Sequence, residues 1–321
     1  MTETPPFGPR VAGQLAAGAF LLIDKPRGPS SHQVTAWVRD LVGVERAGHA
    51  GTLDPNVSGL LWVGLGPALK LLPLILEFPK RYVGLVSFHG PVPPRELDRV
   101  VAEFTGPIYQ TPPVRSAVRR ERRVRVVHRF EVLERTKDSA LVDLVVDSGT
   151  YVRTLAVDLG EALGVGGNLV ELRRTGTGPF REPQSVTLAT LADATTRARE
   201  GEEDALTSLL HPMEEVWREF PVVRLRASAA SAVAHGAALA KGGIVSISRP
   251  FHTGDSVVLL GAAGEFIAFG TAVRDSDAPA LAREGWVVAP ERVFADASEY
   301  ATSWKSSAPA KAPPPAPPSG D

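Results

Sequence analysis

Residues 48–59, Gly-His-Ala-Gly-Thr-Leu-Asp-Pro-Asn-Val-Ser-Gly, place one carboxylate, Asp54, in a loop that contains three glycines. Glycine permits tight turns and the close approach of a ligand. Pro55 fixes the backbone after Asp54 and restricts Asp54 to extended geometry. His49, five residues upstream, supplies a ring for stacking or hydrogen bonding. The pattern makes Asp54 a candidate catalytic carboxylate, although an Asp-Pro turn with glycines is common in proteins.

Three further segments carry side chains that could work with this carboxylate. Tyr82 opens a strand-like run in Lys-Arg-Tyr-Val, 28 residues beyond Asp54. Tyr151 and Arg153 lie in Ser-Gly-Thr-Tyr-Val-Arg-Thr-Leu, and Leu172 lies in Glu-Leu-Arg-Arg-Thr-Gly-Thr-Gly-Pro-Phe. Each segment alone has an ordinary explanation, such as a packing tyrosine or a Gly-Thr turn that leads into a helix. The four segments gain weight only when they are considered together.

Together with residues 18–32, Gly-Ala-Phe-Leu-Leu-Ile-Asp-Lys-Pro-Arg-Gly-Pro-Ser-Ser-His, these segments resemble, in the same order, the motifs of the TruB-type pseudouridine synthases. The resemblance covers about residues 18–304. It implies an RNA isomerase in which Asp54 is the catalytic carboxylate and Arg153 pairs with it. An opposite charge within a few ångströms keeps a carboxylate ionised.

The resemblance also implies the walls of a uridine pocket. Pseudouridine formation detaches a uracil from C1′, turns it and joins it through C5, so the base must leave its stack and needs apolar faces. In the family, Tyr82 stacks on the target base, Tyr151 helps to line the pocket, and Leu172 packs beneath the base. The resemblance therefore implies Asp54, Arg153 and Tyr82 as the catalytic residues and His49, Tyr82, Tyr151 and Leu172 as the substrate-binding residues. The reaction needs no cofactor and no metal. The sequence does not indicate which intermediate forms.

Arginine is concentrated in one later segment, with eight arginines between Arg115 and Arg135. Alternating arginines on a strand present charge to a phosphate backbone, although a solvated basic strand face would show the same pattern. The segment resembles the archaeal and eukaryotic dyskerin-like subunit of box H/ACA particles rather than the bacterial stand-alone enzymes. The predicted RNA-binding residues of this segment are Arg115, Arg119, Arg120, Arg122, Arg123 and Arg125.

That branch implies a set of partners and leaves two rival functions. The implied partners are a box H/ACA guide RNA, target ribosomal or transfer RNA, a small zinc-containing protein, a β-barrel subunit and a kink-turn RNA-binding protein. The rivals are a stand-alone synthase that modifies position 55 in the T-loop of transfer RNA and a catalytically silent RNA-binding scaffold. Asn168 and Gly176 depart from the family pattern, where a histidine and a basic residue are expected.

Composition is that of an ordinary globular protein, with 321 residues, 44% hydrophobic and 22% charged residues and a formal net charge of −1. The chain has no cysteine, and its seven histidines form no i,i+4 pair, so we expect no metal site. Residues 59–64 have the glycine spacing of a phosphate-binding loop but lack its lysine and hydroxyl residues. The apolar run at 11–23 is too short to span a membrane, so we expect a cytoplasmic protein.

The elements that must position these residues predict an α/β (α+β) protein with two domains. A catalytic domain at 15–215 would contain a mixed, largely antiparallel sheet, with strands at 20–23, 81–88, 124–133 and 140–147 and helices at 32–41 and 154–163. Ser31 is the expected N-cap of the first helix. A flexible segment at 1–14 and a disordered Pro/Ala-rich tail at 304–321 would flank the domains.

The second domain is expected at 220–300. Short strands at 222–225, 244–247, 256–260, 266–273 and 285–288, with one helix at 227–240, predict a small β-barrel. Residues 228–245 and 254–257 resemble the start and a later turn of a PUA domain, which in the family grips the guide RNA. The resemblance adds His235 and Gly236 to the predicted RNA-binding residues.

Overall fold

The computed structural model describes residues 7–111, 121–277 and 285–300. The chain divides into two compact units, Met1–Met213 and Glu214–Asp321. The predicted tail at 304–321 lies outside the described residues. Within the described part of the chain, no helix is long and apolar enough to cross a membrane.

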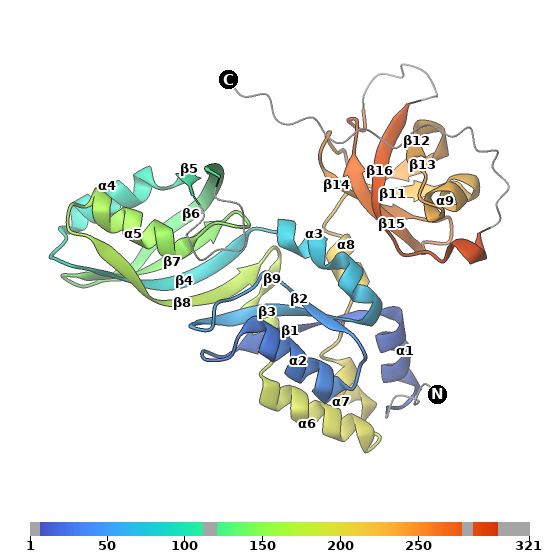
Figure 1. Ribbon diagram of the computed structural model, residues 1–321, viewed down its shortest axis with the longest axis horizontal. Helices are drawn as coiled ribbons and strands as arrows, with labels where there is room; N and C mark the ends of the chain where they lie inside the picture. The colour runs from blue at the N-terminus through green and yellow to red at the C-terminus, as the bar shows by residue number, and fades with distance from the viewer. Residues whose placement is uncertain (1–6, 112–120, 278–284, 301–321) are drawn as a thin grey trace. The chain divides into compact units, whose positions relative to one another are not determined.

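A single twisted sheet organises the first unit (Figure 1). Its strand order is β10-β1-β3-β8-β4-β7-β6-β5, with β2 paired to β3 and β9 paired to β8. The β3–β8 pairing is parallel, and the other pairings between the named strands of this sheet are antiparallel, which confirms the mixed, largely antiparallel sheet. The strands are β1 Ala19–Lys25, β2 Ala47–Ala50, β3 Val57–Leu65, β4 Lys80–Phe88, β5 Gly106–Gln110, β6 Arg123–Arg135, β7 Ser139–Val146, β8 Gly167–Thr177, β9 Phe180–Arg181 and β10 His211–Pro212.

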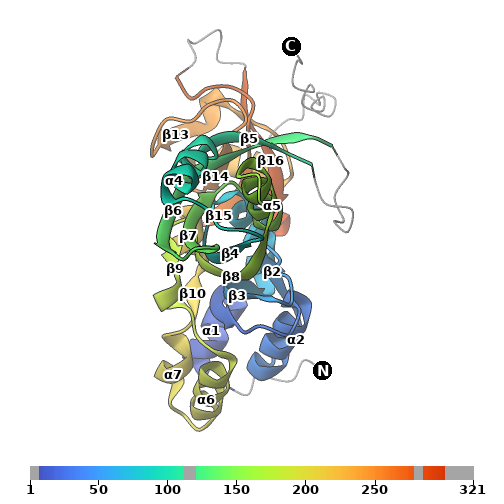
Figure 2. The ribbon, with the colours of Figure 1, turned by 90° about the vertical axis from the view of Figure 1, so that its left-hand side faces the viewer.

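Two groups of helices pack on this sheet. Helices α4 and α5 lie along the half that contains β6, β7 and β8, whereas α1, α2, α6 and α7 gather at the β1–β3 end (Figure 2). The helices of this unit are α1 Pro9–Ala17, α2 Ser31–Val42, α3 Leu72–Glu77, α4 Pro94–Glu103, α5 Val152–Ala162, α6 Leu188–Arg199 and α7 Glu203–Thr207, and α8 Met213–Trp217 begins at its last residue.

Strand β3 is the centre of the core, because all nine of its residues are buried. A strand that is covered on both faces is continuously apolar rather than alternating. Trp62 packs edge-on against Phe20 at 5.3 Å and against Phe180 at 4.5 Å between ring centroids. The glycine spacing at 59–64 therefore belongs to a buried strand and not to a phosphate-binding loop.

Two local predictions are wrong. Part of the segment expected to be flexible at 1–14 is helical, because α1 begins at Pro9, a residue suited to a first helical turn, and buries Val11 and Leu15 at i,i+4 spacing. The N-cap of α2 is Ser30 rather than Ser31: the Ser30 hydroxyl oxygen accepts from the Gln33 amide at 3.1 Å. Ser31 is instead fully buried and contacts the Asp54 loop.

The second unit is a six-stranded sheet with strand order β12-β16-β15-β14-β11-β13. The expected helix at 227–240 is shorter than predicted, because α9 ends at Ala234 and Gly236, with φ of +87°, turns the chain into β12. The last strand is longer than predicted and reaches Val293. The elements are β11 Val222–Leu225, α9 Ala227–Ala234, β12 Leu239–Ala240, β13 Ile244–Ile247, β14 Ser256–Leu260, β15 Phe266–Ala272 and β16 Trp286–Val293.

Candidate active site

Asp54 and Arg153, 99 residues apart in the chain, meet in the folded protein. The Arg153 Nη2 donates to Asp54 Oδ2 at 2.7 Å. Asp54 lies in the loop between β2 and β3, and Arg153 is the second residue of α5. Their side chains are 60% and 66% exposed, so the pair is open to solvent. An exposed ion pair contributes only about 0–1 kcal/mol and cannot by itself hold the Asp54 loop against the start of α5. The backbone on each side must therefore set the geometry.

Side-chain and main-chain bonds fix the residues on both sides of Asp54. The Ser31 hydroxyl accepts from the Leu53 amide and donates to the Leu53 carbonyl, both at 2.8 Å. The Gly28 amide donates to the Pro55 carbonyl at 2.8 Å. The motif at residues 18–32 thus supports the Asp54 loop, which explains why this motif and the motif at residues 48–59 occur together.

Lys25 adds a buried cation to this support. Its side chain is fully buried, and its Nζ donates to the carbonyls of Pro26 at 2.8 Å, Pro29 at 2.9 Å and Pro55 at 3.4 Å. Burial lowers the pKa of Lys25 below its ordinary value, while the Asp54 carboxylate opposes that shift. Lys25 stands in the motif at residues 18–32 but was not among the predicted site residues.

His49 is held as part of the same support rather than directed freely outward. Thr35 Oγ1 donates to the Ser31 carbonyl at 2.8 Å and lies 3.0 Å from His49 Nδ1. The threonine has a single hydroxyl proton, so the network assigns the imidazole proton to Nδ1 and leaves Nε2 as an acceptor for Thr52 at 3.3 Å. Burial lowers the pKa of His49, with His32 nearby acting in the same direction. The ring is therefore neutral at neutral pH.

Tyr82 and Leu172 share one face of the sheet. Residues directly opposite each other in an antiparallel pair point to the same side, and Tyr82 opposes Arg174 while Gly84 opposes Leu172. A Cβ at Gly84 would lie 3.2 Å from Leu172 Cδ1, so the glycine leaves room over the leucine. Leu172 also pairs with Val57, which begins β3 three residues after Asp54. The sheet register thus brings the leucine, the tyrosine and the start of the aspartate loop together.

Arg174 lies on this same face, and its guanidinium is fully buried. Its Nε donates to the Leu60 carbonyl at 2.7 Å, and Tyr82 lies opposite it in the β4–β8 pairing. Burial lowers the pKa of Arg174, while Tyr82 opposes the shift. A Cβ at Gly51, whose φ is +68°, would lie only 3.1 Å from Arg174 Nη1. The glycine in the aspartate loop therefore has a packing reason that the sequence alone did not reveal.

Tyr151 is the N-cap residue of α5, two positions before Arg153. The buried side chain of Gln110, at the end of β5, contacts its main chain: Tyr151 N donates to Gln110 Oε1 at 2.9 Å, and Gln110 Nε2 donates to the Tyr151 carbonyl at 3.1 Å. Gln110 was not among the predicted site residues. A contact between a strand end and a helix start 41 residues later leaves no local signal in the sequence.

The predicted basic residues divide into three groups. Arg123 and Arg125 lie on β6 opposite Gln110 and Ile108, and the Arg122 guanidinium lies 4.4 Å from the centroid of the Tyr109 ring. Arg125 also approaches the turn before α5, since its Nη2 would lie 3.3 Å from a Cβ on Gly149. The second group, Arg115, Arg119 and Arg120, lies outside the described part of the chain. The third group, His235 and Gly236, belongs to the second unit and follows the end of α9.

The two departures from the family pattern have structural partners. Asn168 Oδ1 lies 3.1 Å from His89 Nε2, so the side chain joins the start of β8 to the residue that follows β4. A Cβ at Gly176 would lie 3.0 Å from the Phe180 carbonyl across the β8–β9 turn. Glycine at this position therefore allows the tight return of the chain.

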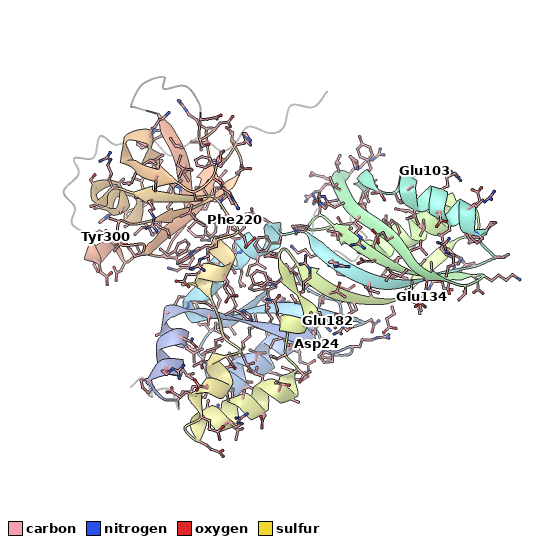
Figure 3. The ribbon with its side chains drawn as sticks, turned by 180° about the vertical axis from the view of Figure 1, so that it is seen from behind. Asp24, Glu103, Glu134, Glu182, Phe220 and Tyr300 are labelled. Atoms are coloured by element: carbon pink, nitrogen blue, oxygen red, sulfur yellow. The ribbon has the colours of Figure 1, made fainter. Side chains whose placement is uncertain are left out.

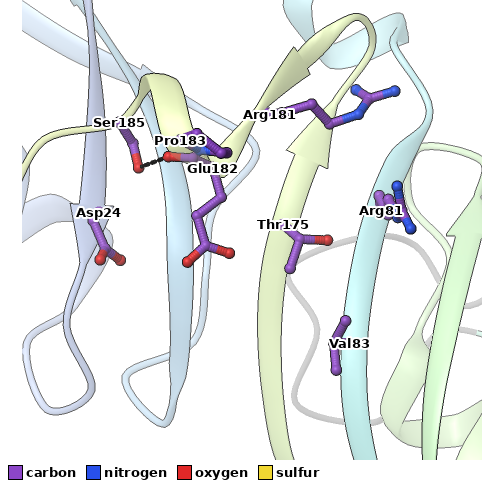
Figure 4. A pocket seen from close by; sticks show the side chains of 8 residues that line it. All are labelled: Asp24, Arg81, Val83, Thr175, Arg181, Glu182, Pro183 and Ser185. Carbon is purple, nitrogen blue, oxygen red and sulfur yellow. Dashed lines mark hydrogen bonds between the residues drawn. The ribbon is translucent and has the colours of Figure 1, made fainter. Parts of the chain in front are cut away.

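A pocket on the opposite face of β8 does not include the candidate site. Arg173 points away from the face that carries Leu172 and Arg174, and its guanidinium bonds Asp24 at 2.9 Å and also Glu182. Both carboxylates line the pocket in Figure 4, and they lie close together in Figure 3, which views the fold from behind. The full lining is Asp24, Arg81, Val83, Thr175, Arg181, Glu182, Pro183 and Ser185.

The bonds from Arg173 to Asp24 and Glu182 indicate that the carboxylates of this pocket belong to a structural ion network. Among the residues that the structure describes, no group of three or more His, Asp or Glu side chains could hold a metal ion.

Three family models match consecutive parts of the chain. The N-terminal domain of TruB family pseudouridylate synthase matches residues 39–91, the C-terminal domain of tRNA pseudouridylate synthase B matches residues 153–217, and the PUA domain matches residues 221–294. Curated relatives cover most of the chain. "Probable tRNA pseudouridine synthase B" from Pyrobaculum arsenaticum is 43% identical over 94% of this chain and 91% of the relative. The protein of the same description from Methanothermobacter thermautotrophicus is 40% identical over 94% and 93%.

Solved structures resemble the chain over nearly its whole length. A chain of the crystal structure of a Cbf5-Nop10-Gar1 complex matches with a TM-score of 0.84 and 38% identity, over 92% of this chain and 90% of that chain. A chain of an H/ACA RNP bound to a substrate RNA containing 2′-deoxyuridine matches with a TM-score of 0.80 and 37% identity, over 94% and 92%.

Proposed function

This chain belongs to the TruB family of pseudouridine synthases, with a C-terminal PUA domain, and we propose that it is the catalytic subunit of a guide-RNA-directed box H/ACA complex. It would convert specific uridines of ribosomal RNA, and also of transfer RNA, to pseudouridine in the cytoplasm. Isomerase activity follows from the family. The guided mode of action and the residue roles are the proposal.

The observation that carries the residue roles is the 2.7 Å bond between Arg153 and Asp54. In the proposed reaction the N1–C1′ bond of a flipped-out uridine breaks, the uracil turns, a C5–C1′ bond forms, and the C5 proton is lost while N1 gains one. Asp54 stabilises or traps the charge that develops, or acts as a base, and Arg153 keeps its carboxylate ionised and directed at the substrate. Tyr82 stacks on the base, Leu172 packs beneath it, and Tyr151 completes the pocket, with His49 supporting the loop.

The guided mode rests on the solved structures and on the distribution of charge. The matching chains belong to complexes described as Cbf5-Nop10-Gar1, archaeal box H/ACA sRNP Nop10-Cbf5 and an H/ACA RNP with a substrate RNA. By that likeness we propose the guide RNA, a Nop10-like zinc-containing protein, a Gar1-like β-barrel subunit and a kink-turn RNA-binding protein as partners. Arg122, Arg123 and Arg125 provide charge for RNA beside the turn that precedes α5.

A second candidate function also has support. The curated relatives are described as probable tRNA pseudouridine synthase B, which favours a stand-alone enzyme that acts on transfer RNA. Both candidates use the same site, so only the RNA requirement separates them.

Tritium release from RNA that contains 5-³H-uridine distinguishes these functions. We expect release from a target RNA only when a matching H/ACA guide and the partner subunits are present. Release from bare transfer RNA alone would favour the stand-alone enzyme, and no release under any condition would favour the scaffold.

Asp54→Asn tests the residue role in the same assay. We expect it to abolish release while RNA binding stays within about twofold, because the asparagine keeps the shape of the side chain and removes its charge. Asp193→Asn, on the exposed surface of α6, is the matched control and should retain full activity. Turnover near the wild-type rate in Asp54→Asn would remove Asp54 from the mechanism.

A further inference from the structure

Gln110 is a buried polar side chain that the proposed reaction does not use directly. It lies at the end of β5, is 3% exposed, and uses both halves of its amide on the main chain of Tyr151. The side chain therefore hydrogen-bonds the Tyr151 amide and the Tyr151 carbonyl at the start of α5, as the main chain of a paired strand would. Buried amides are expected to be paired in this way, but the choice of partner is specific.

The start of α5 needs support from outside the helix. The first four amide groups of a helix have no acceptor within it, and Tyr151, the N-cap, has an extended backbone with φ of −91° and ψ of 93°. The turn before it contains Gly149 at φ of +77° and a bond from the Thr150 amide to the Asp147 carbonyl. Asp147 in turn accepts from the Val126 amide on β6 at 2.9 Å. The helix start is thus attached to the paired strands β5 and β6, and the Gln110 side chain bonds to the main chain of Tyr151 itself.

The start of α5 also carries Arg153. Arg153 follows Tyr151 by two residues, and its bond to Asp54 is too exposed to position either partner. On the other side of the ion pair, Ser31 and Gly28 hold the residues that flank Asp54. The Gln110–Tyr151 bonds are the equivalent anchor for the arginine.

We propose that Gln110 is a positioning residue that sets Arg153 and Tyr151 relative to Asp54. The inference rests on the roles proposed above for Arg153 and Asp54. A misplacement of about 1 Å in a catalytic group can reduce the rate about 100-fold. The basic residues Arg123 and Arg125 lie on β6, whose pairing with β5 is a main-chain ladder that the Gln110 side chain does not form, so RNA binding should change little. Loss of Gln110 should therefore act on kcat and leave KM nearly unchanged.

Kinetics of the full complex with guide and target RNA test this expectation. Gln110→Ala should lower kcat about 10- to 100-fold with KM within about threefold of wild type, and Gln33→Ala, on the exposed surface of α2, should match wild type. Gln110→Glu keeps an acceptor for the Tyr151 amide but has no amide donor for the Tyr151 carbonyl. It should therefore also lower kcat while KM stays near the wild-type value. A loss confined to KM, or no loss, would overturn the proposal.

A double-mutant cycle separates positioning from general damage. If Gln110 acts through Arg153, then Gln110→Ala should reduce single-turnover rates much less in an Arg153→Lys background than in the wild type. The same factor in both backgrounds would show that Gln110 acts independently of Arg153 and would overturn the proposal.

Hydrogen exchange gives a readout that does not depend on activity. The Tyr151 amide should exchange at least about tenfold faster in Gln110→Ala, with the amides of β3 unchanged, because its acceptor is gone. Unchanged exchange at Tyr151 would refute the anchor whatever the kinetics show. An inactive wild-type complex would instead count against the proposed function, while the exchange result would still decide whether Gln110 holds Tyr151.

Discussion

Gly59→Ala tests the junction on which the active-site face is built. Gly59 lies in β3 with φ of +100° and pairs with Arg174 in the parallel β3–β8 ladder. A Cβ added there would lie 2.2 Å from the Arg174 carbonyl oxygen and 2.8 Å from its amide nitrogen. Backbone atoms of a central strand cannot rotate away as a flexible side chain can, so the two strands would have to separate.

The expected cost has two parts. A non-glycine residue at positive φ costs about 1–2 kcal/mol, and forcing a methyl group into a packed core costs about 1–3 kcal/mol more. We therefore expect Gly59→Ala to lower the free energy of unfolding by about 3 kcal/mol. The separated strands would also displace Arg174 and Leu172, so isomerase activity should fall beyond what the loss of folded protein explains.

Two other glycines separate these parts. Gly164→Ala, at φ of +73° with no atom within 4 Å of the added Cβ, should carry only the conformational cost of about 1 kcal/mol. Gly13→Ala, in the exposed face of α1 with open space around it, should be neutral or stabilise by about 0.5–1 kcal/mol.

Urea unfolding followed by circular dichroism, with hydrogen exchange in β3 to assign the transition to the first unit, provides the comparison. The reasoning would be refuted if Gly59→Ala were no less stable than Gly164→Ala.

Two further perturbations test the electrostatics of the first unit. Burial, aided by Arg174, lowers the pKa of Lys80 to about 7, so between pH 7 and 10 the unfolded chain holds a proton at this residue that the folded protein lacks. The free energy of unfolding should therefore rise with pH across this window by up to about 1.4 kcal/mol per pH unit, and Lys80→Met should remove that contribution; an unchanged slope in urea unfolding would contradict it. Arg123→Ala should weaken RNA binding about equally for different sequences and reduce the slope of log affinity against log salt by about 1. The control Arg39→Ala, at a residue that pairs with Asp40 on α2, should leave the affinity and the slope unchanged. Equal effects of the two variants in salt titrations would remove Arg123 from the RNA interface.

Sequence patterns predicted the elements well where local chemistry decides them. In the second unit, the predicted strands at 222–225, 244–247 and 256–260 agree with β11, β13 and β14 at both ends, because short β-branched runs are bounded by glycine and polar turns. The helix at 227–240 was predicted too long, since small residues continue past Gly236 and only the positive φ there ends the helix. Composition cannot distinguish a helical alanine from one that begins a strand.

Contacts across the fold were predictable only in part. The meeting of Asp54 and Arg153 was expected from a resemblance, not from spacing, because 99 residues separate them. The groups that hold them gave no such signal. Ser31 was predicted as a helix cap because serine before an apolar run is typical of one, yet the neighbouring Ser30 caps the helix and Ser31 bonds to Leu53. Which of two adjacent serines faces inward depends on the tertiary path of the Asp54 loop, which local propensity does not contain.

The groups that hold the site share a physical property that separates their effect on stability from their effect on activity. Lys25, Gln110 and Arg174 are buried, and the structure shows each bonded to main-chain carbonyls or amides of a loop or strand near the exposed ion pair. Burying a cation carries a desolvation cost that hydrogen bonds to carbonyls offset only in part.

Well-packed apolar replacements of similar volume, such as Lys25→Met, can therefore leave the free energy of unfolding unchanged or raise it, while they release the loop that carries Asp54. A survey that scored variants by stability alone would classify Lys25 and Arg174 as replaceable, because what they provide is the orientation of two solvent-exposed side chains. Their contribution becomes visible only when stability and kcat are measured on the same variant.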